Sequence, residues 1–313
     1  MLKTKIGVCV LAAGLLAGCG GGGGDAEAVA TVPLSVANYE TVALTVAASV
    51  VGSGNIISDA FEDTASADLA RPTTAQVRAL NSGRVANIAR FSFNRLAVRQ
   101  QGLERPAVAW TEIEPCTLSG YLSIRINDAD NDGYESVGDS VTVTANQCQV
   151  EAGEPAVNGS LGYRITDLRY DALGYFMAGA FEMSFTNFTS AGLVLNGSAS
   201  VSMNSAEFVI SYKNLSTSYE EQTLSQNYTF RDSATNGITV TGLYTINGST
   251  YTLSTPAAMR MGLMYPNMGT LRIEDGRGNR LDSFMFNSGF TADLYLAGDT
   301  VRDASQFYLW SEL

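Results

Sequence analysis

Apolar and polar residues alternate along most of the chain beyond residue 120, and this period of two predicts β-strands. In the first such run, Leu122, Ile124 and Ile126 alternate with Ser123 and Arg125. Because neighbouring side chains of a strand point to opposite faces, the pattern is typical of a strand with one buried face. The alternation recurs at 140–145, 161–168, 180–188, 198–203, 206–212, 237–246, 249–254, 269–273, 283–286, 292–296 and 306–310. Short connections predict an antiparallel meander of roughly ten or more strands.

The segment before these strands is predicted to be helical. Residues 39–51 are mostly apolar, Asn38 precedes them as an N-cap, and the Gly-Ser-Gly-Asn sequence at 52–55 should end the helix. Within 73–101, apolar residues recur every three to five positions, which predicts a second helix. Residues 25–40 are small and polar, and we expect them to lack fixed structure.

The second predicted helix is basic. Between residues 69 and 103 the chain carries six arginines and no acidic residue until Glu104: Arg71, Arg78, Arg84, Arg90, Arg95 and Arg99. Such a helix suits contact with lipid headgroups or lipopolysaccharide phosphates. The alternative, which we favour, is that these arginines face solvent or pair with acidic residues of the sheet.

Together these patterns predict an α+β fold that is mainly β. N-terminal helices should pack on a large twisted antiparallel sheet, and a sheet of this size usually curls or closes, here as an open barrel around a helix. We divide the chain into a leader at 1–18, a tether at 19–36, a helical segment at 37–105 and a β domain at 106–313.

One short motif recurs where strands begin. Asn-Gly-Ser stands at 158–160, 196–198 and 247–249, and Asn236-Gly237 is a fourth Asn-Gly pair. Asn-Gly suits the positive φ angles of a tight hairpin turn, so we interpret these sites as turns. The triplets also match a glycosylation sequon, which is the alternative interpretation.

Composition excludes several kinds of chemistry. The 313-residue chain has no histidine, so a Ser-His-Asp or Cys-His nucleophile and a His-ligated metal are ruled out. Lys3 and Lys5 lie in the leader, so the 19 basic residues fall to 17 without it, against 31 acidic residues, a formal charge of −14. This charge argues against nucleic acid as a partner.

The first nineteen residues have the pattern of an export signal. Lys3 and Lys5 precede an apolar run, Ile6 to Ala17, which is too short to span a bilayer, and Leu16-Ala17-Gly18 lead into Cys19. The segment resembles a bacterial lipoprotein signal. The resemblance implies that Cys19 carries a diacylglycerol and an N-acyl chain and becomes the first mature residue. An ordinary cysteine in a secretory signal or membrane anchor is the alternative.

The glycines that follow this cysteine suit a membrane tether. Gly20 to Gly24 form a flexible stretch between the bilayer surface and the folded domain. By resemblance to Gram-negative lipoproteins, Gly20 after the cysteine favours the outer membrane.

Two cysteines remain after Cys9 and Cys19 are assigned to the leader and the lipid. Cys116 and Cys148 form an even pair in an oxidising compartment, and we predict a disulfide between them. Two free buried thiols are the alternative.

A twelve-residue loop between these cysteines has the spacing of a calcium site. Acids stand at its positions 1, 3, 5 and 12, glycine at position 6, and a backbone carbonyl and a hydroxyl are offered at 7 and 9. The candidate ligands are Asp128, Asp130, Asp132, Tyr134, Ser136 and Asp139. The loop is similar to dockerin-type and other extracellular calcium loops, because strands flank it and position 12 is Asp. A calcium-free, Asx-rich turn is the alternative.

The combined features resemble a group of uncharacterised, β-rich, proteobacterial outer-membrane lipoproteins. The resemblance rests on the lipoprotein signal, the glycine tether, Asn38-Tyr39-Glu40, the cysteine-bracketed acidic loop and the stretch 265–273. The chain departs from the group at its end, where Ala297-Gly298-Asp299 replaces a final Gly-Asp-Gly segment. The resemblance implies a location and no activity.

Two functions fit these observations. The first is a lipid-anchored cell-envelope protein without catalysis, a structural or protein-binding module stabilised by a disulfide and a calcium loop. The second is a carrier of a lipid or other apolar ligand inside a curved sheet. For the carrier, flexible methionines would line the cup, namely Met259, Met261, Met264, Met268 and Met285, although methionines also fill ordinary cores. An enzyme is disfavoured.

Overall fold

The structure is a computed structural model that describes residues 30–61, 109–131, 136–149, 152–153, 155–172, 176–190, 193–219, 222–262 and 265–313. These residues form a single sheet of fourteen strands, one α-helix and a short 3-10 helix. The elements are α1 (Tyr39–Phe61), β1 (Ala109–Pro115), β2 (Ser119–Asn127), β3 (Ser140–Gln149), β4 (Val157–Tyr170), β5 (Phe176–Ser190), β6 (Leu193–Asn204), β7 (Glu207–Tyr219), β8 (Gln222–Ser233), β9 (Gly237–Ile246), β10 (Ser249–Met261), β11 (Pro266–Glu274), β12 (Arg280–Phe286), β13 (Gly289–Tyr295), β14 (Ala304–Leu309) and η1 (Trp310–Glu312).

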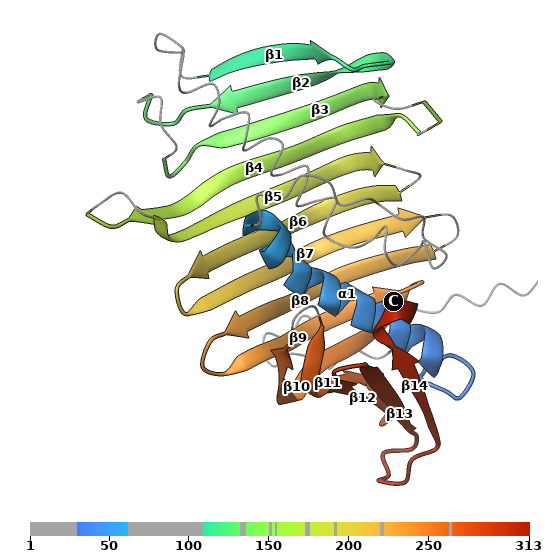
Figure 1. Ribbon diagram of the computed structural model, residues 1–313. Helices are drawn as coiled ribbons and strands as arrows, with labels where there is room; N and C mark the ends of the chain where they lie inside the picture. The colour runs from blue at the N-terminus through green and yellow to red at the C-terminus, as the bar shows by residue number, and fades with distance from the viewer. Residues whose placement is uncertain are drawn as a thin grey trace, which may run out of the picture.

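The strands pair in chain order, and every pairing is antiparallel (Figure 1). The expected meander, with an N-terminal helix packed on a large sheet, is therefore confirmed. The sheet does not close, because β1 and β14 stand at its two edges. Each predicted run overlaps a strand, but the sequence missed β1 and β8. In β8 a buried polar residue, Gln226, interrupts the apolar alternation.

Two of the three Asn-Gly-Ser motifs are not turns, which corrects the prediction. Asn247-Gly248 does form the turn between β9 and β10, with φ angles of 48° and 80°. The motifs at 158–160 and 196–198 instead lie inside β4 and β6, where the strand register shifts. They are β-bulges, and each glycine has a positive φ, 88° at Gly159 and 111° at Gly197.

The bulges lie against one another on successive strands. A Cβ added to Gly159 would lie 2.1 Å from the carbonyl oxygen of Asn187, and one added to Gly197 would lie 2.2 Å from that of Asn214. Asn196, which precedes Gly197, stabilises the bulge with its side chain: its Oδ1 accepts a hydrogen bond from the backbone N–H of Asn187 at 2.7 Å. Bulges increase the local right-handed twist, so a row of them makes the sheet coil.

Helix α1 is longer than its sequence predicts. The expected end at 52–55 is wrong, since the helix continues to Phe61. Asn38 does not cap it through its side chain either. Asn38 Oδ1 instead accepts the N–H of Ser35 at 2.9 Å, which fixes the preceding turn, while its carbonyl accepts the first helical bond, from Val42.

The core lies between α1 and one face of the sheet. Figure 1 shows α1 running across the strands, from β6 and β7 near its C-terminal end to β13 and β14 near its start. Val42, Val46 and Val50 are at most 3% exposed, and burying each contributes about 1.5–3 kcal/mol. Residues 45–53 of the helix are buried on every side, as expected for a helix without a continuous polar face.

The chain before α1 is bound to the sheet, although the sequence assigns residues 30–36 to a tether without fixed structure. The buried carboxylate of Asp275 accepts the N–H of Leu34 at 3.0 Å, and the N–H of Ala30 bonds to the carbonyl of Asp275 at 2.9 Å. Tyr251 donates its hydroxyl to the carbonyl of Val32 at 3.0 Å. From Ala30 onward the segment is therefore ordered. The second predicted helix, 73–101, lies outside the described residues.

Candidate metal centre and disulfide

The connection between β2 and β3 brings acidic side chains together. Asp128 follows the last residue of β2, and Asp139 precedes the first residue of β3. One carboxylate oxygen from each of Asp128, Asp130 and Asp139 lies within 4.8 Å of the other two. Asp128 is buried, Asp139 half-buried and Asp130 exposed, so the cluster opens to solvent on one side. These carboxylates could hold a metal ion.

Backbone N–H groups of the same loop hold two of these carboxylates in place. Asp139 Oδ1 accepts the N–H of Ala129 at 2.8 Å, and Asp139 Oδ2 accepts that of Ser136 at 2.7 Å. Asp128 Oδ1 accepts the N–H of Asn131 at 2.7 Å, and Asn131 has a φ of 59°. Such side-chain to backbone bonds are those of an Asx-rich turn. The loop therefore has the geometry of this turn and also a cluster of carboxylates.

The donor set fits a hard cation. A carboxylate has about four lone-pair sites, so the three bonds that Asp139 accepts, from two N–H groups and the hydroxyl of Ser136, still leave it a free site. Calcium binds oxygens at about 2.3–2.6 Å, which places ligands on opposite sides up to about 5 Å apart. The 4.8 Å limit on the three carboxylates meets this condition. The hydroxyl of Ser136 lies 3.3 Å from Asp139 Oδ1, beside the cluster, whereas Asp132 and Tyr134 lie outside the described residues.

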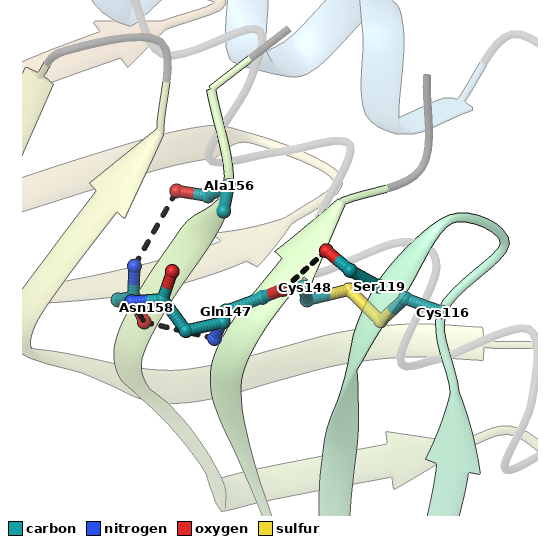
Figure 2. The surroundings of a disulfide bond; sticks show 6 residues. All are labelled: Cys116, Ser119, Gln147, Cys148, Ala156 and Asn158. Atoms are coloured by element: carbon teal, nitrogen blue, oxygen red, sulfur yellow. Dashed lines mark hydrogen bonds between the residues drawn. A yellow bond between two sulfur atoms is a disulfide. The ribbon is translucent and has the colours of Figure 1, made fainter. Parts of the chain in front are cut away.

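The structure joins Cys116 to Cys148, as the sequence predicts. Their Cα atoms are 5.5 Å apart, and the bond links the chain before β2 to the end of β3 (Figure 2). Beside it, the carbonyl of Gln147 accepts the hydroxyl of Ser119 at 3.2 Å, and the N–H of Gln147 bonds to Asn158 Oδ1 at 2.9 Å. The disulfide thus lies at the first bulges of the row.

The acidic loop and the disulfide close opposite ends of one hairpin. Asn127 pairs with Ser140 next to the loop, and Ser119 pairs with Gln149 next to the disulfide. The eight residue steps from Ser119 to Asn127 correspond to about 26 Å of strand. A cation at the loop and the disulfide would therefore stabilise this hairpin independently, at separate places.

A buried cluster of hydroxyls between α1 and the sheet escaped the sequence analysis. Ser53 Oγ lies 2.9 Å from the hydroxyl of Tyr212 and 3.0 Å from that of Tyr228, and Ser49 Oγ lies 2.7 Å from the hydroxyl of Tyr244. Burial raises the pKa of Tyr212 to about 12, although its hydrogen bond to Ser53 opposes this shift. Burial also raises the pKa values of Tyr228 and Tyr244. A Ser-x-x-x-Ser spacing in the helix was the available signal.

Two buried carboxylates also lie side by side, on β12 and β13. Asp282 pairs with Asp293 across the strands, and they are 4% and 7% exposed. Arg272 binds Asp282 with two bonds, of 2.7 and 2.9 Å, while Arg302 lies 3.2 Å from Asp293. Ser305 donates its hydroxyl to Asp293 at 2.5 Å. The two arginines offset the repulsion between the carboxylates.

The other predicted site residues are dispersed. Met259 and Met285 are buried in the core at 0% and 4% exposure, Met261 packs partly against it, and Met268 is 51% exposed. Met264 and Cys19 lie outside the described residues. The four described methionines therefore do not line one common cup.

In the part of the chain that the structure describes, no helix has both the length and the apolar character needed to cross a membrane. The chain matches no protein-family model, no curated protein and no solved structure.

Proposed function

We propose that this chain is a lipid-anchored protein of the outer membrane that acts, without catalysis, as a structural or protein-binding module. The leader that ends at Cys19 and the glycine tether after it support the anchor. The disulfide supports an oxidising compartment. The side of the membrane on which the domain lies is left open by this proposal.

We further infer that the loop of Asp128, Asp130 and Asp139 binds calcium in a structural role. The approach of three carboxylates to within 4.8 Å is the observation that carries this inference. Without a cation, like charges this close repel one another. Calcium prefers such all-oxygen sites, and extracellular modules bind it with dissociation constants of about 10⁻⁴–10⁻³ M.

The packing supports a module better than a carrier. A carrier needs an apolar cavity, but α1 occupies the apolar face of strands β4 to β13, and its buried side chains join the same core as theirs. Native mass spectrometry of the full chain tests this choice. We expect only the lipid bound to Cys19 and the mass of calcium, whereas a second apolar molecule released on denaturation would contradict the module and favour the carrier.

The anchor is tested by metabolic labelling with a palmitate analogue in a Gram-negative host. The wild-type chain should be labelled, and Cys19→Ser should abolish the label. Cys9→Ser is the matched control, because it changes a leader cysteine that the proposal does not lipidate. Equal labelling of the wild type and Cys19→Ser would overturn the anchor.

Calcium binding is tested by thermal and urea unfolding of the full chain. At a calcium concentration one hundred times the dissociation constant, a single site should raise the free energy of unfolding by about 2.7 kcal/mol. Asp130→Asn should remove most of this gain. Glu207→Gln is the control, since its carboxylate pairs with Arg231 and lies on β7, four strands away from β3. Equal stability with calcium and with chelator would refute the site.

A further inference from the structure

The face of the sheet opposite α1 carries a polar groove. Its hollow has a volume of about 320 Å³ and crosses strands β3 to β7. Small and hydroxylated residues line much of its length, with two basic residues at its margins: Thr142, Gly162, Arg164, Ser184, Ser198 and Lys213. Tyr163, Met183 and Ala199 of the same strands also line it. We call this hollow the polar groove.

The strand register explains how the polar groove is built. Thr142, Gly162, Ser184, Ser198 and Lys213 are successive cross-strand partners, so they form one row across five strands. Four steps between strands correspond to a length of about 19 Å. Gly162 has no side chain and the serine side chains beside it are short, so the surface of the sheet is hollowed in the middle of this row.

The polar groove faces away from the core. Gly162 and Arg164 flank Tyr163, which is 7% exposed and belongs to the core cluster. Lys213 follows Tyr212, which bonds to Ser53 of α1. Because successive residues of a strand point to opposite faces, the groove residues project on the side away from the helix.

The two basic side chains of the polar groove are available for a ligand. Arg164 and Lys213 are exposed, and among the described residues neither side chain forms an ion pair or hydrogen bond. Glu182 is the cross-strand partner of Arg164 and also lines the groove, yet no ion pair joins them in the described structure. Beyond the leader, Lys213 is the only lysine of an acidic chain.

We propose that the polar groove binds an acidic oligosaccharide, a hydroxyl-rich chain that bears carboxylate or phosphate groups. Serine and threonine hydroxyls both donate and accept hydrogen bonds, so they match sugar hydroxyls. Arg164 and Lys213 supply the charge for the anionic groups, with the guanidinium able to bind them through two parallel bonds. Glu182 accepts hydrogen bonds from sugar hydroxyls. The length of the row suits an extended ligand laid across the strands.

An acidic peptide fits the polar groove less well. Peptides that bind to sheets commonly add a strand at an exposed edge, where backbone groups are unpaired. The groove instead lies in the interior of the sheet, where β4, β5 and β6 each have a paired strand on both sides. Recognition must therefore come mainly from side chains, and those that project on this face are hydroxyls and the charged groups of Arg164, Glu182 and Lys213.

The experiment is calorimetric titration of the full chain in a detergent without a sugar headgroup, at low ionic strength. The probes are tetragalacturonic acid and a phosphorylated oligomannose, with maltotetraose as the neutral control. We expect at least one acidic probe to bind, at least tenfold more tightly than maltotetraose. Either acidic probe supports the proposal, and the tighter one identifies the anion.

Variants locate the binding. Lys213→Gln and Arg164→Gln should each weaken it about 10-fold or more, as expected for loss of a charge-assisted hydrogen bond. Ser184→Phe should abolish it by filling the row with a ring that an exposed strand position tolerates. Arg231→Gln is the matched control, because Arg231 is an exposed arginine of β8 on the same face and pairs with Glu207 outside the groove. It should bind like the wild type.

Three results would overturn the proposal. The first is that no acidic oligosaccharide binds, and the second is that Ser184→Phe binds as tightly as the wild type. The third is that a glutamate-rich peptide of equal charge binds as tightly as the acidic oligosaccharides. Unfolding curves of each variant, measured in parallel, distinguish loss of the groove from loss of the fold.

Discussion

Replacing Ser53 by alanine tests whether the buried hydroxyl cluster fixes α1 on the sheet. Ser53 Oγ donates to the carbonyl of Ser49 at 3.0 Å and lies within hydrogen-bond distance of the hydroxyls of Tyr212 and Tyr228. A serine hydroxyl has one proton and two acceptor sites. All three are used if both tyrosines donate to it. The substitution therefore removes a fully used partner from the interior.

The structure sets the size of the effect. Tyr228 retains an acceptor, because its hydroxyl lies 3.3 Å from the carbonyl of Ser49. The hydroxyl of Tyr212 has no other hydrogen-bond acceptor among its described contacts. Burying one unsatisfied hydroxyl costs about 1–3 kcal/mol, and the better helix propensity of alanine returns at most about 0.5 kcal/mol. We expect Ser53→Ala to lower the free energy of unfolding by about 2 kcal/mol.

A double-mutant cycle provides the assay. The free energy of unfolding is measured from urea curves of the full chain, followed by circular dichroism. Tyr212→Phe alone should cost about 1 kcal/mol, but in the Ser53→Ala background it should cost nothing, because the hydroxyl that it removes is already unsatisfied. The expected coupling is therefore about 1 kcal/mol or more. Additivity within about 0.5 kcal/mol would refute the reasoning.

Three further predictions concern the pKa of Tyr212, the disulfide and the glycine of a bulge. Burial raises the pKa of Tyr212 to about 12, so the stability that this tyrosine contributes is complete below about pH 10 and is lost as the pH rises to about 12. Absorbance at 295 nm should show alkaline unfolding between these pH values, and Tyr212→Phe should shift the midpoint of this unfolding to a higher pH. Replacing Cys116 and Cys148 by serine opens a loop of sequence separation 32, which should cost about 3.7 kcal/mol in the chain-entropy description, measured as a lower urea midpoint. Gly197 and Gly248 both have a positive φ, but the Cβ of Gly197→Ala would lie 2.2 Å from a backbone oxygen, whereas that of Gly248→Ala meets nothing within 4 Å. In urea unfolding, Gly197→Ala should therefore lower the free energy of unfolding by at least about 2 kcal/mol more than Gly248→Ala does. Equal losses would show that the bulge is not tightly packed.

Period-two alternation was enough to predict twelve of the fourteen described strands, because most of these strands bury one face. The residues 140–149 illustrate this, since Val141, Val143 and Ala145 are buried between exposed polar residues. The alternation failed in β8, where Gln226 occupies a core position at 5% exposure. A buried polar residue is invisible to a hydrophobic pattern, since its burial depends on partners that lie elsewhere in the chain.

The end of α1 shows how tertiary contacts override a local signal. Glycine and serine are poor helix formers, and glycine costs about 1 kcal/mol relative to alanine, so a stop at 52–55 was the reasonable expectation. In the structure Ser53 instead bonds to Ser49 and two tyrosines. The two tyrosines lie more than 150 positions away in the chain, and no local pattern can reveal such contacts.

The acidic cluster was predictable because its candidate ligands belong to one short segment, so their spacing alone brings Asp128, Asp130 and Asp139 together. The polar groove was not, because each strand contributes one or two residues and the register decides which face they occupy. A slip of one residue in β4 would move Gly162 to the core face.

The bulge row keeps the two faces of the sheet distinct. Each bulge inserts an unpaired residue, and without a matching bulge on the next strand the alternation on that strand would fall out of step with its neighbour. Bulges on neighbouring strands lie side by side and therefore keep the alternation of the two strands in step. The register shift between Phe185 and Phe188 on β5 lies next to that between Asn196 and Ser198 on β6. The Asn-Gly sequences at 158–159 and 196–197 therefore mark positions that hold the register. The same register places tyrosines under α1 and hydroxyls in the polar groove, so the core and the proposed binding face depend on one set of backbone contacts.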